Sequence, residues 1–164
     1  MRSTKAIRQR GTQLVEFAII LPMLVLMFFV VTEGTAMIRV HQILNNAARE
    51  GARMASSDNL LYGPDNTTRT NERNQIINSV KTYVCENMKG CVLNDPDPTK
   101  PWSKIAVTIS PDEVQVTNPS TGSLMDTTIV TVQYPYTLQY LPAFSLGIVS
   151  NTYNLGARAQ FRTL

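Results

Sequence analysis

The N-terminal part of the chain contains a 19-residue apolar stretch, from Leu14 to Thr32, whose only charged residue is Glu16. As an α-helix with a rise of about 1.5 Å per residue, this stretch is about 28 Å long, close to the ~30 Å thickness of a bilayer's hydrocarbon core. Pro22 would remove one hydrogen bond and bend that helix, which membrane helices tolerate better than soluble ones. The stretch therefore predicts a transmembrane helix or a secretion signal.

The residues before this stretch are basic. The chain has 15 basic and 12 acidic residues, a formal net charge of +3. Four of the basic residues precede the apolar stretch with no acid among them, and the other 11 leave a net charge of −1 over residues 12–164. The positive charge belongs to the N-terminus, which excludes a nucleic-acid-binding surface. Because Lys and Arg beside a membrane segment stay in the cytoplasm, we expect residues from about 35 onward to be translocated.

Two interpretations of the apolar stretch leave something unexplained. A secretion signal would need a small-residue cleavage site, for which Gly34-Thr35-Ala36 is a weak candidate, but Glu33 stands inside that region and the apolar core is long. A plain single-span anchor accounts for most of the segment but not for Glu16, because a carboxylate at the edge of an apolar helix is costly unless it is paired, hydrated or protonated.

A third interpretation makes Glu16 functional. If the chain were cut after Gly11, Thr12 would be the first residue of the mature protein, Glu16 the fifth and Phe17 the sixth. A basic leader that ends in Gly and is followed by Glu at position five, an aromatic residue and an apolar stretch resembles a type IV prepilin. The segment "RGTQLVEFAIILPMLVLMF", followed by "NNAAREGARMA", is similar to the TadE-like pseudopilins of the tight-adherence pilus system. The resemblance covers about residues 9–56.

The resemblance implies a role for individual residues. Gly11 would be the last residue of the leader, recognised by an inner-membrane prepilin peptidase, and Thr12 would become the N-terminal residue. Glu16 would offer its carboxylate to the N-terminal amine of a neighbouring subunit during assembly. Phe17 corresponds to an aromatic position of the family, and Pro22 matches a common proline.

The resemblance also implies a function, partners and a location. The chain would be a minor pseudopilin, a pilus assembly component without a cofactor, whose partners are other pilin and pseudopilin subunits, the prepilin peptidase and the inner membrane. It would bind no nucleic acid and no small-molecule substrate. It would cross the bacterial inner membrane once, with a cytoplasmic N-terminus and a periplasmic head, or reach an extracellular pilus. The alternative is a constitutively membrane-anchored extracytoplasmic binding or scaffold protein.

The sequence divides into a basic leader (1–11), a transmembrane segment (12–33), an amphipathic continuation of the helix (34–57) and an extracytoplasmic head (58–164). The continuation carries a stripe of small residues at helical spacing: Ala47, Ala48, Gly51, Ala52 and Ala55. This small-residue stripe can pack against the protein's own sheet or against helices of other subunits. We favour the protein's own sheet, and both can hold along different parts of the stripe.

The head begins with a polar loop over residues 57–71, followed by a second helix at about Asn71–Met88 with Gly90 as its C-terminal cap. A proline-rich loop spans Asn94–Pro101. From Trp102 on, alternating apolar residues predict strands at 105–109, 114–116, 127–137 and 154–162, with turn-prone residues 118–123 and an apolar loop packed on the core at 141–150. Pro135 suggests an edge strand or a bulge. The expected fold is pilin-like α+β, with the long helix on a small antiparallel sheet.

The head offers few residues suited to chemistry. Cys85 and Cys91 lie six residues apart, and we expect a disulfide in a translocated domain, with two free core thiols as the alternative. No metal site is expected, because His41 is the only histidine and lies far from both cysteines in sequence. Asp95 and Asp97 are too few for calcium and indicate a solvated loop. No catalytic set is recognisable, so we do not expect an enzyme.

Overall fold

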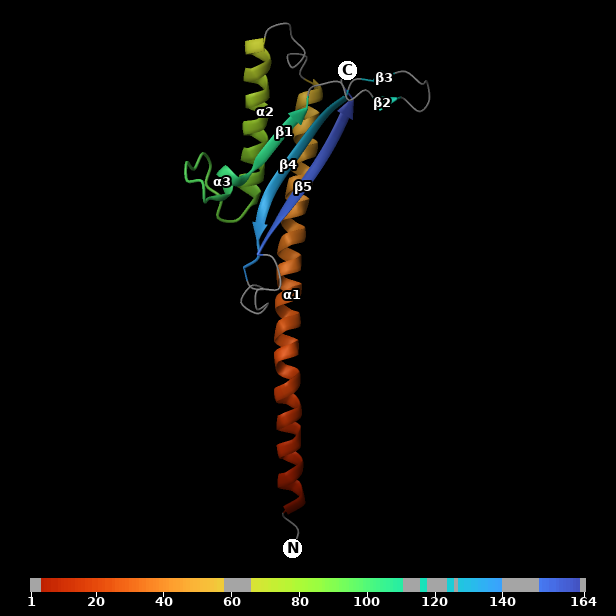
Figure 1. Ribbon diagram of the computed structural model, residues 1–164, viewed down its shortest axis with the longest axis vertical. Coiled ribbons are helices and arrows are strands. Elements are labelled where there is room, and N and C mark those ends of the chain that lie inside the picture. The colour runs from red at the N-terminus through yellow and green to blue at the C-terminus, as the bar shows by residue number, and fades with distance from the viewer. Residues whose placement is uncertain are drawn as a thin grey trace. The chain divides into compact units, whose positions relative to one another are not determined.

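The computed structural model describes residues 4–57, 66–110, 116–117, 124–125, 127–139 and 151–162; for residues 4–12, 57, 66, 116–117, 124–125 and 162 it describes the backbone and not the side chains. The elements are α1 (Thr4–Ser57), α2 (Asn66–Asn87), α3 (Pro101–Lys104), β1 (Ala106–Ser110), β2 (Val116–Thr117), β3 (Leu124–Met125), β4 (Thr127–Thr137) and β5 (Thr152–Arg162) (Figure 1). The chain forms two compact units. One contains residues Met1–Met37 and Thr137–Asn151, and the other contains Ile38–Tyr136 and Thr152–Leu164.

Helix α1 is a single 54-residue helix that continues through Pro22. It starts at Thr4, within the predicted leader, and not at Thr12. It ends at Ser57, where the sequence predicts the change from apolar periodicity to a polar loop.

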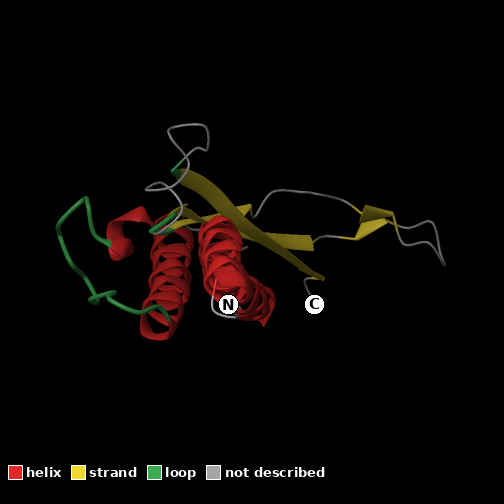
Figure 2. Ribbon diagram, turned by 90° about the horizontal axis from the view of Figure 1, so that it is seen from below, coloured by secondary structure: helices red, strands yellow, loops and turns green. Residues whose placement is uncertain are grey.

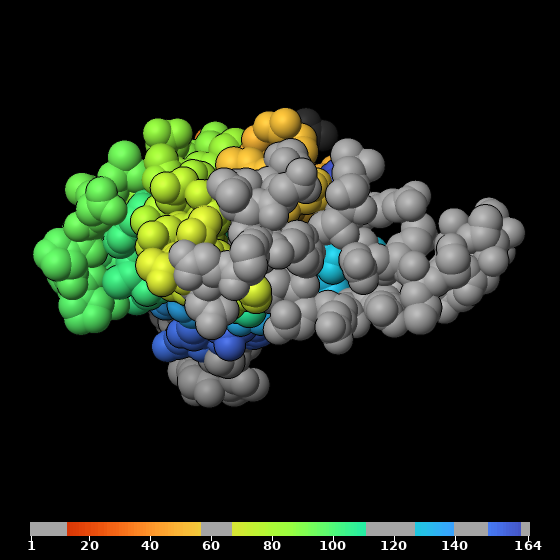
Figure 3. Space-filling model, turned by 90° about the horizontal axis from the view of Figure 1, so that it is seen from above, coloured from red at the N-terminus to blue at the C-terminus, as the bar shows by residue number. Residues whose placement is uncertain are grey.

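The second unit has a helical layer on one face of a three-stranded sheet. Residues of α1 from Ile38 onward and α2 lie on this face (Figure 2), and their side chains adjoin each other at the surface in Figure 3, α1 in orange and α2 in yellow-green. The core between these layers is aliphatic and fully buried, with Leu44 of α1, Val80 and Val84 of α2, and Val130 and Val132 of β4. An α+β fold, with a long helix on a small antiparallel sheet, is confirmed.

The small-residue stripe is buried within this unit. Its four alanines have no exposed surface. A Cβ added at Gly51 would stand 2.5 Å from Val80 Cγ2 and 3.2 Å from Val130 Cγ1, so α1 passes both α2 and β4 at close range. These small side chains therefore serve packing inside the protein's own domain, as favoured from the sequence.

The sheet has the order β1-β4-β5, with β4 in the centre. Strand β4 has the predicted bounds, Thr127–Thr137, and pairs antiparallel with β1 from Ala106–Gln133 to Ser110–Ile129. Although β4 is the central strand, its pairing with β1 ends at Gln133, two residues before Pro135. On the β1 side Pro135 therefore lies on an unpaired edge late in the strand, where its missing N–H interrupts no bond of that ladder.

Several boundaries differ from the sequence-based expectation. Helix α2 starts at Asn66, inside the predicted loop, since polar Asn and Thr residues suit a helix N-terminus but give no apolar periodicity. Pro101 and Trp102 belong to the short helix α3, because Pro is favoured in a first helical turn.

The strand boundaries differ as well. Strand β1 starts at Ala106, and β5 starts at Thr152. Val116 lies in β2, which pairs with β3. The predictions for residues 118–123, 141–150 and Val114 lie outside the described residues.

Candidate functional site

The candidate site is the N-terminal part of α1, where the sequence places processing and assembly. Gly11 and Thr12 lie within the helical backbone of α1. Glu16 and Phe17 follow one to two turns later, and both side chains are exposed, Phe17 by 57%. Glu16 has no hydrogen-bond or ion-pair partner among the side chains that the structure describes.

From Leu14 to Val31, Glu16 is the one polar residue on the surface of α1. Successive helical residues point about 100° apart, and nearly all side chains from Leu14 to Val31 are exposed, up to 77% for Met23. In the described part of the chain, α1 is the one helix that is long and apolar enough to cross a membrane, by length and composition. Its apolar window is not buried in the protein, which distinguishes it from a soluble core helix. Such a surface needs lipid or other subunits around it.

Polar side chains near the end of the apolar stretch are satisfied locally. The Thr32 hydroxyl donates to the Phe29 carbonyl oxygen at 2.9 Å, and the Thr35 hydroxyl donates to the Val31 carbonyl oxygen at 2.8 Å. Bonds of this kind let a hydroxyl sit on an apolar helix without an unpaired donor. The polar end of the stretch is therefore compatible with an apolar environment.

Glu33 is a residue that the sequence analysis did not single out as functional. Its side chain is only 2% exposed, and its Oε1 accepts a hydrogen bond from the Gln139 backbone N–H at 3.1 Å. Both residues belong to the first compact unit. The sequence does contain a signal for Glu33, because it directly follows the apolar stretch, just as Glu16 lies near its start. A carboxylate at the edge of an apolar helix is costly unless it is paired, hydrated or protonated, and is therefore a functional candidate.

The helix surface beyond Ile38 carries an exposed polar face with Arg49 and Arg53. The Arg53 guanidinium donates to both Glu50 carboxylate oxygens, at 2.6 Å and 3.0 Å. These hydrogen bonds lower the pKa of Glu50. The pair is exposed and spaced i, i+3 on one helix, so it stabilises the helix surface and forms no recognisable site.

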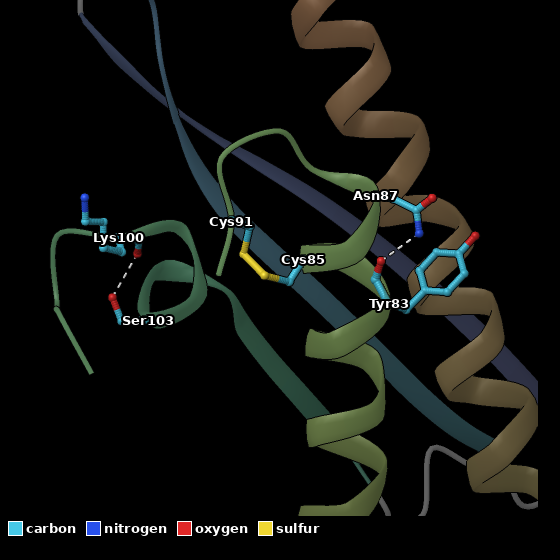
Figure 4. The surroundings of a disulfide bond; sticks show 6 residues. All are labelled: Tyr83, Cys85, Asn87, Cys91, Lys100 and Ser103. Atoms are coloured by element: carbon cyan, nitrogen blue, oxygen red, sulfur yellow. Dashed lines mark hydrogen bonds between the residues drawn. A yellow bond between two sulfur atoms is a disulfide. The ribbon is translucent and has the colours of Figure 1, made fainter. Parts of the chain in front are cut away.

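Cys85 and Cys91 are joined by a disulfide, which links the last turn of α2 to the loop that follows it (Figure 4). Gly90 has a φ of +75°, the left-handed conformation that glycine adopts most easily, and lies three residues past the helix end. It thus belongs to the turn that returns Cys91 to Cys85. In the same region the Asn87 side chain donates to the Tyr83 carbonyl oxygen at 2.8 Å.

The two acids of the proline-rich loop serve the loop itself. The Asp95 carboxylate accepts from the Asp97 backbone N–H at 3.0 Å. The Asp97 carboxylate accepts from the Thr99 backbone N–H at 2.8 Å and from the Thr99 hydroxyl at 2.7 Å, and these two bonds lower the pKa of Asp97. The carboxylates therefore act as turn acceptors. Within the described ranges, no three His, Cys, Asp or Glu residues gather as metal ligands would.

Comparison with known families agrees with the resemblance seen in the sequence. The model of a family described as TadE-like protein matches residues 11–53, which include Gly11, Glu16, Phe17 and most of the small-residue stripe. The match is consistent with a TadE-like protein of the tight-adherence pilus system. It covers the N-terminal helix and not the head. The comparisons with curated proteins and with solved structures gave no match.

Proposed function

We propose that this chain is a minor pseudopilin of a tight-adherence pilus, cleaved after Gly11 by a prepilin peptidase and inserted into an assembly through its N-terminal helix. The observation that carries the proposal is Glu16, an exposed carboxylate at the start of a helix surface that is otherwise apolar from Leu14 to Val31. The TadE-like match, which starts at Gly11, supports it.

The charge of Glu16 explains how such a subunit could recognise its neighbour. A carboxylate in lipid or between packed apolar helices must be paired or neutralised. Cleavage before Thr12 creates an α-amine, a positive charge about 6 Å along the helix axis from Glu16. A neighbouring subunit shifted along the axis can bring its own amine to this carboxylate, and removing one partner of such a desolvated pair costs about 3–5 kcal/mol.

Phe17 completes the proposed contact. Its ring is exposed beside Glu16 and offers a large apolar area to an adjacent helix. The neighbour's amine would thus fix the axial position of two helices, while Phe17 and the surrounding aliphatic side chains would provide the apolar contact area.

The proposed location follows from the distribution of charge. The four basic residues before Gly11 favour a cytoplasmic N-terminus. With that orientation the head would lie in the periplasm of a bacterial cell and, after assembly, in an extracellular filament. The Cys85–Cys91 disulfide fits this oxidising side of the membrane.

The proposal is tested by replacing Glu16 in the organism that makes the pilus. Glu16→Ala and the isosteric Glu16→Gln should both keep membrane insertion and cleavage, but the variants should be lost from sheared filaments or abolish filament formation. Gln13→Ala, about one turn earlier on the same exposed surface, is the matched control and should assemble normally. Unchanged filaments with both Glu16 variants, together with wild-type chain that never leaves the membrane, would favour the constitutively anchored binding or scaffold protein.

A further inference from the structure

Strand β5 has one edge that no strand of the described part of the chain pairs with. The sheet order is β1-β4-β5, so β4 occupies one edge of β5 and the other edge is a side of the sheet (Figure 1). The strand is 11 residues long and contains no proline. A long edge strand offers a row of backbone N–H and C=O groups to another strand, and natural proteins often shorten such strands or interrupt them with proline. The edge of β5 is therefore suited to pairing.

The buried face of β5 is apolar along the strand but is covered only in the middle. Leu155, Ala157 and Ala159 alternate along this face and are at most 8% exposed. The same alternation places Tyr153 and Phe161 on this face, one toward each end, where they are 37% and 40% exposed. Apolar area thus remains open at both ends of the strand, within reach of a strand added at the unpaired edge.

The opposite face of β5 is polar, with the exposed residues Asn154, Gly156, Arg158 and Gln160. A Cβ added at Gly156 would stand 3.7 Å from Gln133 Cγ of β4. The side-chain amide of Gln160 donates to the Thr127 hydroxyl oxygen at 3.0 Å. Both contacts are made to β4, which holds β5 from the side opposite its unpaired edge.

The sequence of β5 is self-complementary for antiparallel pairing about Ala157. We consider the register in which Ala157 stands opposite Ala157 of a second copy. Tyr153 then stands opposite Phe161 of the second copy, and Leu155 stands opposite Ala159. Aromatic side chains directly opposite each other on one face stabilise a strand pair. The two half-exposed aromatic residues of each copy therefore cover those of the other.

The polar face agrees with the same register. Asn154 stands opposite Gln160 of the second copy, so two uncharged amides meet. Arg158 stands opposite Gly156, so the two Arg158 side chains do not face each other. The neighbouring registers are worse. A shift in one direction places Arg158 opposite itself, where like charges repel, and a shift in either direction separates the aromatic pair.

We propose that two copies of this protein pair through their β5 edges, antiparallel about Ala157, and join their three-stranded sheets into one. The contact is isologous, since each copy contributes the same surface. Its two-fold axis is perpendicular to the sheet, so the strands of the second copy and the part of its α1 beyond Ile38 point the opposite way (Figure 1). The pairing therefore joins heads that project toward each other from separate membranes or filaments, and not neighbours within one filament.

Cross-linking of the full chain in detergent micelles tests the register. A preparation of Asn154→Cys and one of Gln160→Cys should form a mixed disulfide dimer when they are combined and oxidised, because the two positions stand opposite each other. Each preparation alone should not, since two copies of one position are six residues, about 20 Å, apart along the strands. Thr108→Cys, exposed on the polar face at the other edge of the sheet, is the control and should not link to Gln160→Cys.

Charge at Gly156 tests the pairing without a cross-link. An added Cβ there makes only ordinary contacts with Gln133 and Val132, so substituted chains should fold as before. Gly156→Lys places a positive charge opposite Arg158 of the second copy, and Gly156→Glu places a negative charge there. The contact occurs twice in the dimer, so we expect the dimer dissociation constant to rise and fall, respectively, by about 2- to 30-fold.

Sedimentation of the full chain in detergent measures this constant, and circular dichroism checks that each variant is folded. Adding Arg158→Glu to the Gly156→Lys variant makes the pair attractive again and should restore the dimer. A wild-type chain that stays monomeric at the highest attainable concentration would overturn the proposal, as would a dimer that neither Gly156 variant changes. A disulfide between Thr108→Cys and Gln160→Cys would overturn it in favour of a head-to-tail sheet. These measurements need neither cleavage after Gly11 nor filaments, so their failure leaves the role proposed for Glu16 untouched.

Discussion

Gly51 of α1 lies so close to Val80 of α2 that an added Cβ would stand 2.5 Å from Val80 Cγ2. Val80 is 1% exposed and β-branched, so its side chain has little freedom to move aside. The close approach of the two helices thus depends on a residue without a side chain. It explains why the helix retains a glycine where alanine would be the better helix former.

Gly51→Ala should therefore destabilise the protein. Overpacking of a buried site costs about 1–3 kcal/mol, while Ala in place of Gly favours a helix interior by about 1 kcal/mol, so we expect a net loss of up to about 2 kcal/mol. Gly34→Ala is the matched control on the same helix, because nothing lies within 4 Å of its added Cβ, and it should not lower the melting temperature. Thermal unfolding in detergent, followed by circular dichroism, measures both.

The cause of that loss can be isolated with a second variant. Val80→Ala alone should destabilise by leaving a cavity, but in the Gly51→Ala background it also removes the clash. The double variant should lose clearly less stability than the sum of the two single variants. Additive losses would show that Gly51 matters for another reason than contact with Val80.

The Cys85–Cys91 disulfide should contribute to the stability of the head. A bridge that closes so short a loop stabilises by about 2 kcal/mol, and Cys91→Ser should lower the melting temperature accordingly. Reductant should lower the melting temperature of the wild-type protein by a similar amount and leave Cys91→Ser unaffected. Alkylation of both cysteines in the folded protein without reductant would refute the bridge.

The loop from Asn94 to Lys100 should respond to acid through Asp97. The backbone N–H and the hydroxyl of Thr99 both donate to its carboxylate and hold the pKa of Asp97 below the ordinary value. A depressed folded-state pKa gives stability that is present above the ordinary pKa and is lost as the pH falls through the folded value. NMR titration of the Asp97 carboxyl carbon measures it. Thr99→Val should move the pKa back toward the ordinary value, and a wild-type pKa at or above that value would contradict the bonding.

The sequence predicts those parts of the fold that have a local pattern. The end of α1 and both bounds of β4 follow from apolar periodicity, and the resemblance of the N-terminal segment is carried by contiguous residues around Gly11 and Glu16. The start of α2 at Asn66 was missed because its first turns carry no apolar face. A pattern of apolar residues therefore does not reveal where such a helix starts.

Other features depend on contacts between distant residues. The central place of β4, despite Pro135, follows from which strands pair with it, and no local signal specifies that. The bond between Glu33 and Gln139 joins residues 106 positions apart. An acid at the end of an apolar stretch marks Glu33 as unusual, but only the folded chain identifies what it holds.

The central claim is that this chain is cut after Gly11 and then assembles through Glu16. The N-terminal residue of the mature protein, determined by sequencing and intact mass on sheared filaments and on membranes of the native host, tests it most directly. We expect a chain that begins at Thr12 in both fractions. An intact Met1 confined to the membrane would contradict the claim, as would a soluble product that begins near Met37.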